Sequence, residues 1–85
     1  MESYPKVLSV VPQAGKRLLV TFSNQVKKVY DCTPLLSEEV FSSLSDEWVF
    51  KAVQRDPGGY GVSWSDEIDL SEAELWVNGL LAAED

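Results

Sequence analysis

The stretch Arg17-Leu18-Leu19-Val20-Thr21-Phe22 decides the fold class of this 85-residue chain. Its second, fourth and sixth residues are apolar, which is the two-residue period of a strand with one buried face. Runs rich in β-branched residues at 7–11 and 26–30 lie on either side, and only short turns separate them from the central stretch. Because such turns join antiparallel neighbours, the N-terminal part of the chain predicts a three-stranded antiparallel meander.

A second hairpin is predicted in the C-terminal half. Residues 48–55 and 60–64 are typical of a fourth and a fifth strand, and Asp56-Pro57-Gly58-Gly59 between them is a strong turn signal. A turn and a short extended piece follow at residues 65–70. Between the meander and this hairpin, residues 37–44 carry apolar side chains one helical turn apart and predict a short central helix.

The sequence Ser71-Glu72-Ala73-Glu74 is a capping box, the usual start of a helix. Gly79 is expected to end this helix early. The predicted fold class is α+β: an antiparallel sheet of about five strands, the meander plus the second hairpin, with a short central helix and a C-terminal helix packed on it. Residues 1–85 are expected to form a single domain with its core at about residues 5–81. The apolar stripe expected to face the sheet is Ala73, Trp76, Val77, Leu80 and Leu81.

The composition limits the chemistry of the chain. There is no histidine, which removes the usual catalytic triads and most zinc sites. The single cysteine, Cys32, has no partner for an internal disulfide and is expected to be a half-buried structural thiol. There is no signal-peptide pattern and no apolar stretch long enough to cross a membrane, so a cytoplasmic location away from membranes is expected.

No enzymatic activity is expected. Asp66 and Asp69 are paired carboxylates, but acid–base catalysis needs a pocket that separates their pKa values, and a chain this short rarely encloses both a core and a pocket. We therefore predict no catalytic residues, no metal site and no cofactor. The tryptophans Trp48, Trp64 and Trp76 are predicted to lie in the core, whereas an exposed tryptophan would be an interface anchor.

Charge is distributed unevenly along the chain. The net charge is −7, but residues 1–30 carry five basic residues and one acidic residue, and residues 31–85 carry two basic and thirteen acidic ones. The densest part is residues 66–74, with five carboxylates in nine positions. One interpretation is a solvated surface with two acids at a helix start; the other is a surface that attracts a cationic partner. Direct binding to nucleic acid is not expected, because phosphates need Lys and Arg.

Four local patterns follow one another along the chain: Pro5-Lys6-Val7, Leu19-Val20-Thr21-Phe22, Tyr30-Asp31 before Pro34-Leu35-Leu36, and residues 62–71. Together they resemble the small bacterial family called domain of unknown function 2442, whose members occur alone or in toxin–antitoxin-like gene pairs. The resemblance covers residues 5 to 76 or so and implies the fold, since no activity is established for the family. Two positions depart from its pattern: Asn24-Gln25 replaces an easier Asp-Gly or Asn-Gly turn, and Glu67 replaces a glycine.

The leading hypothesis is an acidic inhibitor that binds the basic nucleic-acid-binding surface of a protein partner. Its carboxylates would replace phosphates, as in DNA-mimicking phage and plasmid proteins such as anti-CRISPR proteins, and a CRISPR effector subunit is one candidate partner. The alternative is an antitoxin-like or accessory module that binds a basic toxin through an exposed sheet edge. Either would act in a bacterial or phage-infected cell as a monomer or weak dimer. The predicted partner-binding residues are Asp66, Glu67, Asp69, Glu72 and Glu74, extended by Asp46 and Glu47.

Overall fold

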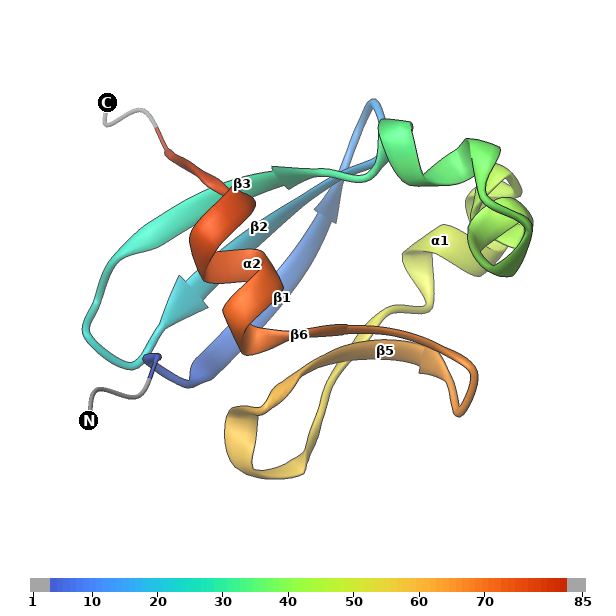
Figure 1. The fold of residues 1–85 in the computed structure, drawn as a ribbon. Helices are drawn as coiled ribbons and strands as arrows, with labels where there is room; N and C mark the ends of the chain where they lie inside the picture. The colour runs from blue at the N-terminus through green and yellow to red at the C-terminus, as the bar shows by residue number, and fades with distance from the viewer. Residues whose placement is uncertain (1–3, 83–85) are drawn as a thin grey trace.

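The structure is a computed structural model that describes residues 4–82, so the ends of the expected domain, residues 1–3 and 83–85, lie outside it. Two antiparallel sheets, with strand orders β1-β2-β3-β7 and β4-β5-β6, form the framework (Figure 1). The α+β fold class is confirmed, with the strands divided between two sheets. The strands are β1 (Val7–Gln13), β2 (Arg17–Phe22), β3 (Lys27–Asp31), β4 (Gln54–Arg55), β5 (Gly61–Ser65), β6 (Ile68–Ser71) and β7 (Leu80–Leu81). The helices are η1 (Thr33–Ser37), η2 (Glu39–Ser45) and η3 (Pro57–Gly59), all 3₁₀, and α1 (Glu47–Lys51) and α2 (Glu72–Asn78).

The N-terminal meander forms as the alternation predicts. β2 has the predicted bounds and pairs with β1 on one side and β3 on the other. Leu18, Val20 and Phe22 are at most 1% exposed, so their face of the sheet is the buried one. β1 continues through Pro12 to Gln13, beyond its predicted end. Proline is tolerated there because β1 is an edge strand of its sheet.

The segment between β3 and β5 differs from the prediction. In place of one helix and a long fourth strand, the chain forms η1, η2, α1 and the two-residue strand β4. The strand predicted over residues 48–55 is therefore wrong except at Gln54–Arg55. Its residues favour a strand by propensity, but the Asp46 side chain accepts a hydrogen bond from the backbone N–H of Trp48 and begins a helix. That helix places Phe50 in the core, where it is fully buried.

The second sheet is attached to the edge of β1. β4, β5 and β6 pair in sequence order, with the predicted turn, now η3, between β4 and β5. Gly59 has a φ of +78° and lies so close to β1 that an added Cβ would be 2.6 Å from the carbonyl oxygen of Val7, so only glycine fits. The Nε–H of Arg55 donates a hydrogen bond of 2.7 Å to the same oxygen.

Helix α2 begins and ends where predicted, but a different side of it faces the core. Ser71 caps the first turn with its side chain, and Gly79 follows the last residue. Leu75 is fully buried, whereas Val77 is 60% exposed. The predicted stripe is therefore wrong at Val77 and in leaving out Leu75, whereas Trp76 packs against the core as predicted. The last two residues of the stripe, Leu80–Leu81, leave the helix and pair with β3 as β7.

Helix α2 covers the buried face of the four-stranded sheet, which confirms the predicted packing. The rings of Phe22 and Trp76 meet edge to face with centroids 5.0 Å apart. The Lys28 ammonium lies 3.9 Å from the centroid of Trp76 and donates a hydrogen bond to the carbonyl oxygen of that residue. Buried residues from both sheets, η2, α1 and α2 form one apolar cluster.

Candidate functional site

Three of the predicted partner-binding carboxylates lie together on the hairpin of β5 and β6. Asp66 and Glu67 form its turn, and Asp69 lies on β6. All three residues are exposed, and within residues 4–82 the structure gives none of them an ion pair. Like charges at this spacing repel one another, so a bound cationic group would relieve the repulsion. The hairpin therefore presents a surface with an unbalanced negative charge.

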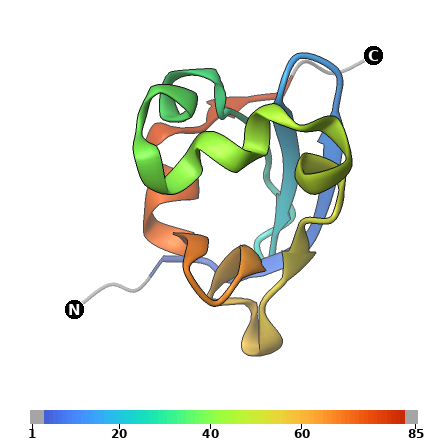
Figure 2. The same ribbon diagram turned by 90° about the vertical axis from the view of Figure 1, so that its right-hand side faces the viewer.

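This hairpin packs against helix α1. Trp64, near the end of β5, donates its indole N–H to the carbonyl oxygen of Phe50 at 2.9 Å, and the two ring centroids are 6.2 Å apart. Trp64 is half-buried against the core, as predicted. In Figure 2, the 3₁₀ helices η1 and η2, helix α1 and the turn between β5 and β6 all face the viewer. The β5–β6 turn and helix α1 thus lie on one side of the molecule.

The two carboxylates at the start of α1 both have local partners. Asp46 is exposed, and its Oδ1 accepts the hydrogen bond from the Trp48 N–H at 2.9 Å. Glu47 forms an ion pair with Lys16 of the turn between β1 and β2. The hydrogen bond from Lys16 lowers the pKa of the Glu47 carboxyl. The basic first hairpin therefore neutralises Glu47, whereas Asp46 is exposed and has no ion pair within residues 4–82.

The two glutamates of α2 hold the helix in place instead of facing solvent. Glu72 forms an ion pair of 2.6 Å with Lys6, which joins the start of α2 to the chain entering β1. Glu74 accepts hydrogen bonds from the Tyr30 hydroxyl at 2.7 Å and from the Asn78 side-chain amide at 3.0 Å. The capping box is thus only half formed, because the Glu74 carboxylate turns to the sheet. The structure separates this pair from the carboxylates of the β5–β6 turn.

Trp48 is the residue that sequence reasoning assigned wrongly. It is 85% exposed, so the prediction that it lies in the core is incorrect. Helix α1 buries Phe50, and two positions along a helix correspond to opposite sides, so Trp48 faces solvent. The helix-capping residue Asp46 was the available signal, since a helix starting there cannot bury both aromatic rings. We call the set Asp46, Trp48, Asp66, Glu67 and Asp69 the acidic side.

Cys32 and Tyr30 are buried ionisable groups that hold their protons more tightly than usual. Cys32 is a free, fully buried thiol, and burial, with a smaller effect of the Asp31 charge, raises its pKa to about 12. Burial and the hydrogen bond to Glu74 raise the pKa of the Tyr30 hydroxyl. Because the thiolate is the nucleophilic form of cysteine, a thiol that keeps its proton is inert. Cys32 therefore packs in the core as a protonated thiol.

A shallow hollow of about 650 Å³ lies at the edge of β3, beyond the end of β7. Its lining includes Arg17, Val29, Asp31, Leu35 and Leu80. Among residues 4–82, no group of three or more Cys, Asp or Glu side chains is arranged to hold a metal ion. None of the helices in that part of the chain has the length and apolar character needed to span a membrane.

Comparison with known proteins gives one match. The model of the family described as Protein of unknown function (DUF2442) matches residues 7–79. No curated protein and no solved structure matches the chain significantly. The matched region extends from the start of β1 to the end of α2, and it includes every predicted partner-binding carboxylate. The chain belongs to the DUF2442 family of proteins of unknown function.

Proposed function

We propose that this chain is a non-enzymatic inhibitor that uses its acidic side to occupy the basic surface of a nucleic-acid-binding protein. The observation that carries the proposal is the group of exposed carboxylates at the β5–β6 turn, fastened beside the helix that presents Trp48. The proposed setting is the cytoplasm of a bacterial or phage-infected cell, with a counter-defence role such as that of anti-CRISPR proteins.

The charge of the site supports this kind of partner. A carboxylate offers two acceptor oxygens to the same arginine and lysine side chains that bind phosphate, through short charge-assisted hydrogen bonds. Asp69 lies on β6, paired with β5, and Asp66 and Glu67 lie in the two-residue turn that joins the two strands, so less conformational entropy is lost on binding than for a disordered acidic tail. The net charge of −7 also repels nucleic acid, which makes competition for its binding protein the more favourable role.

Trp48 supplies the apolar part of the proposed interface. Tryptophan is enriched among the residues that dominate binding energy, and its ring also attracts a guanidinium group. Trp48→Ala is expected to weaken partner binding by about 2 kcal/mol or more. The same change should leave the thermal midpoint almost unchanged, because the ring is 85% exposed. If the Trp48→Ala variant binds the partner as tightly as the wild type does, Trp48 is not part of the interface.

Charge reversal on the turn tests the proposal directly. The wild-type chain and the variant Asp66→Lys with Glu67→Lys are immobilised and exposed to a bacterial lysate, and the captured proteins are identified by mass spectrometry. A control variant, Glu84→Lys with Asp85→Lys, makes the same change in net charge at the end of the chain. Each captured protein is then purified, and its DNA binding is measured with and without the chain.

The expected result is a nucleic-acid-binding protein captured by the wild type and the control but lost by the turn variant. Its DNA binding should fall as the wild-type chain is added. Capture that is equal for all three proteins, or a captured protein that binds DNA and the chain at the same time, would contradict the proposal.

The alternative function is an antitoxin-like module that binds a basic toxin through a sheet edge. One observation favours it: β7 pairs with β3 only at Lys28 and Val29, and Leu80 and Leu81 on it are each 75% exposed. An antitoxin should rescue growth when it is co-expressed with the product of a neighbouring gene. An inhibitor of DNA binding should give no such rescue.

A further inference from the structure

The outer face of the four-stranded sheet carries a continuous apolar row. In the strand register, Val11 of β1 lies opposite Leu19 of β2, Leu19 lies opposite Val29 of β3, and Val29 lies opposite Leu80 of β7. Residues directly opposite each other share a face, so one apolar residue from each strand forms the row. Val11 is 49% exposed and Leu80 is 75% exposed.

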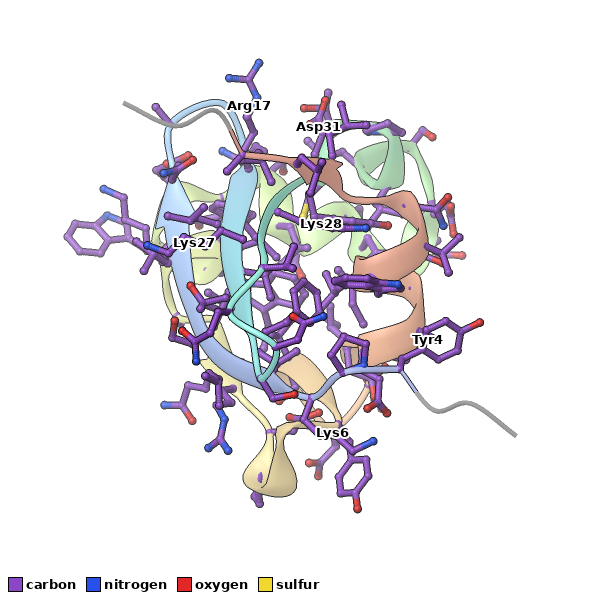
Figure 3. The ribbon with its side chains drawn as sticks, turned by 90° about the vertical axis from the view of Figure 1, so that its left-hand side faces the viewer. Tyr4, Lys6, Arg17, Lys27, Lys28 and Asp31 are labelled. Atoms are coloured by element: carbon purple, nitrogen blue, oxygen red, sulfur yellow. The ribbon has the colours of Figure 1, made fainter. Side chains whose placement is uncertain are left out.

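The rest of the fold leaves this row uncovered. The neighbouring row, which includes the buried Val20, faces α2 and the core, and successive residues of a strand point to opposite faces. Figure 3 shows the molecule from the side of the outer face of this sheet. No helix lies in front of β1, β2 and β3 in that view. A contiguous apolar patch on an otherwise charged domain marks an interaction surface.

Opposite charges lie on the two sides of the row along β3. Lys27 lies two residues before Val29 on β3, and Asp31 lies two residues after it, so both share the outer face. Both residues are exposed, and within residues 4–82 neither has an ion pair. Asp31 also lines the hollow at the edge of β3, which leaves room beside it for a long side chain. The side chain of Arg17, opposite Asp31 in register, extends beyond the end of the sheet in Figure 3.

We propose that this face binds a second copy of the chain and forms a symmetric dimer. When the two-fold axis runs along the apolar row, each residue of the row lies over its own copy. The same rotation places Lys27 of one chain over Asp31 of the other, and the second such pair follows by symmetry. An isologous interface requires a self-complementary surface of this kind. The opposite alignment would place Lys27 over Lys27 and is disfavoured by repulsion.

The small area of this face limits the affinity of the dimer. Four strands about 4.8 Å apart and five residues of about 3.3 Å each give a face of roughly 300 Å² in projection. A stable complex buries about 800 Å² on each partner, so this dimer is weak and forms only at high protein concentration. The acidic side lies on other elements, so the dimer and the proposed inhibitor function are independent and are tested separately.

A charge exchange tests the arrangement. Sedimentation equilibrium of the wild type at protein concentrations up to about 1 mM should show a monomer–dimer equilibrium. Lys27→Asp alone and Asp31→Lys alone should each weaken the dimer at least about tenfold, because each places like charges opposite one another. The double variant, Lys27→Asp with Asp31→Lys, should recover it.

The fold of each variant is checked by circular dichroism, because the Asp31 Oδ1 also accepts a hydrogen bond from the Thr33 N–H at 2.9 Å. Asp31→Asn keeps that acceptor and removes only the charge, so it should weaken the dimer in a folded chain. A wild type that stays monomeric over the whole range, or a double variant no better than the single ones, would overturn the proposal and leave the face to a different protein.

Cross-linking tests the position of the axis. Leu19→Cys should be joined to its own copy by a short bis-maleimide linker, because the row lies on the axis and facing sheets pack about 10 Å apart, which is too far for a direct disulfide. The control Thr21→Cys, two residues away on the same face, should not. The native Cys32 is fully buried and does not compete. Equal cross-linking of the two variants would contradict this geometry.

Discussion

Gln25, in the turn between β2 and β3, has a left-handed backbone with a φ of 72°. A side chain in this region costs about 1–2 kcal/mol, which glycine avoids at a smaller entropic cost. Gln25→Gly should therefore raise the free energy of unfolding by about 0.5–1 kcal/mol, measured in urea. The control Asn24→Gly should lower it, because the Asn24 side chain accepts a hydrogen bond from the Val26 N–H at 3.1 Å. A loss of stability in Gln25→Gly would mean that the glutamine side chain stabilises the turn.

The buried Cys32 thiol makes the stability of the fold depend on alkaline pH. Its pKa is about 12 in the folded chain against an ordinary value of 9.0. As pH rises above 9.0, the unfolded chain loses this proton first, so the folded state loses relative stability up to a pH of about 12. Cys32→Ala should therefore lose stability less steeply than the wild type in urea unfolding above pH 9. Tyr30 contributes to both proteins at higher pH, since its pKa is also raised. If the wild type and Cys32→Ala lose stability equally as the pH rises above 9, the Cys32 thiol does not cause this pH dependence.

The sequence did not predict which of the candidate carboxylates form ion pairs with lysines elsewhere in the chain. The charge pattern predicted seven partner-binding carboxylates, and three of them are exposed together on one hairpin. The pairing of Glu72 with Lys6 joins positions 66 residues apart, and that of Glu47 with Lys16 joins positions 31 apart. Contacts of this kind depend on the tertiary fold, and no local spacing predicts them.

At the scale of elements, the sequence predicted those helix and strand boundaries that are determined by interactions between residues close together in the chain. The alternation in β2, the cap at Ser71 and the stop at Gly79 all act within a few residues, and the structure has them where they were expected. Helix α1 was missed because its apolar residues favour a strand, while the Asp46 cap and the burial of Phe50 favour a helix. The division into two sheets was missed because it depends on how β1 meets β4.

The orientation of α2 gives a prediction at this scale. Leu75 is fully buried, and Leu75→Ala should lower the free energy of unfolding by about 2–5 kcal/mol. Val77, on the exposed side of the same helix, is the matched control. Val77→Ala should change the free energy of unfolding by less than about 0.5 kcal/mol. Thermal or urea unfolding of the two variants measures both. The reverse order of effects would restore the helical stripe that the sequence predicted.

At the scale of the whole molecule, folding partly opposes the charge asymmetry of the sequence. Two lysines from the basic N-terminal part neutralise Glu47 and Glu72, so the acidic C-terminal part is not a uniform surface. The β5–β6 turn, the start of α1 and Trp48 remain exposed, as do Glu38 and Glu39 at the junction of η1 and η2. Exposed carboxylates with one exposed aromatic side chain favour a specific protein partner over general repulsion from anions.

The most direct measurement of this claim is the salt dependence of the dissociation constant for the captured partner. Titration calorimetry at about 50 mM and about 300 mM salt should show wild-type binding weaken at least about tenfold, because added ions screen the carboxylates. The variant Asp66→Lys with Glu67→Lys should bind weakly at both concentrations. A wild-type dissociation constant that does not change with salt, and that the turn variant shares, would show that the exposed carboxylates do not form the binding site.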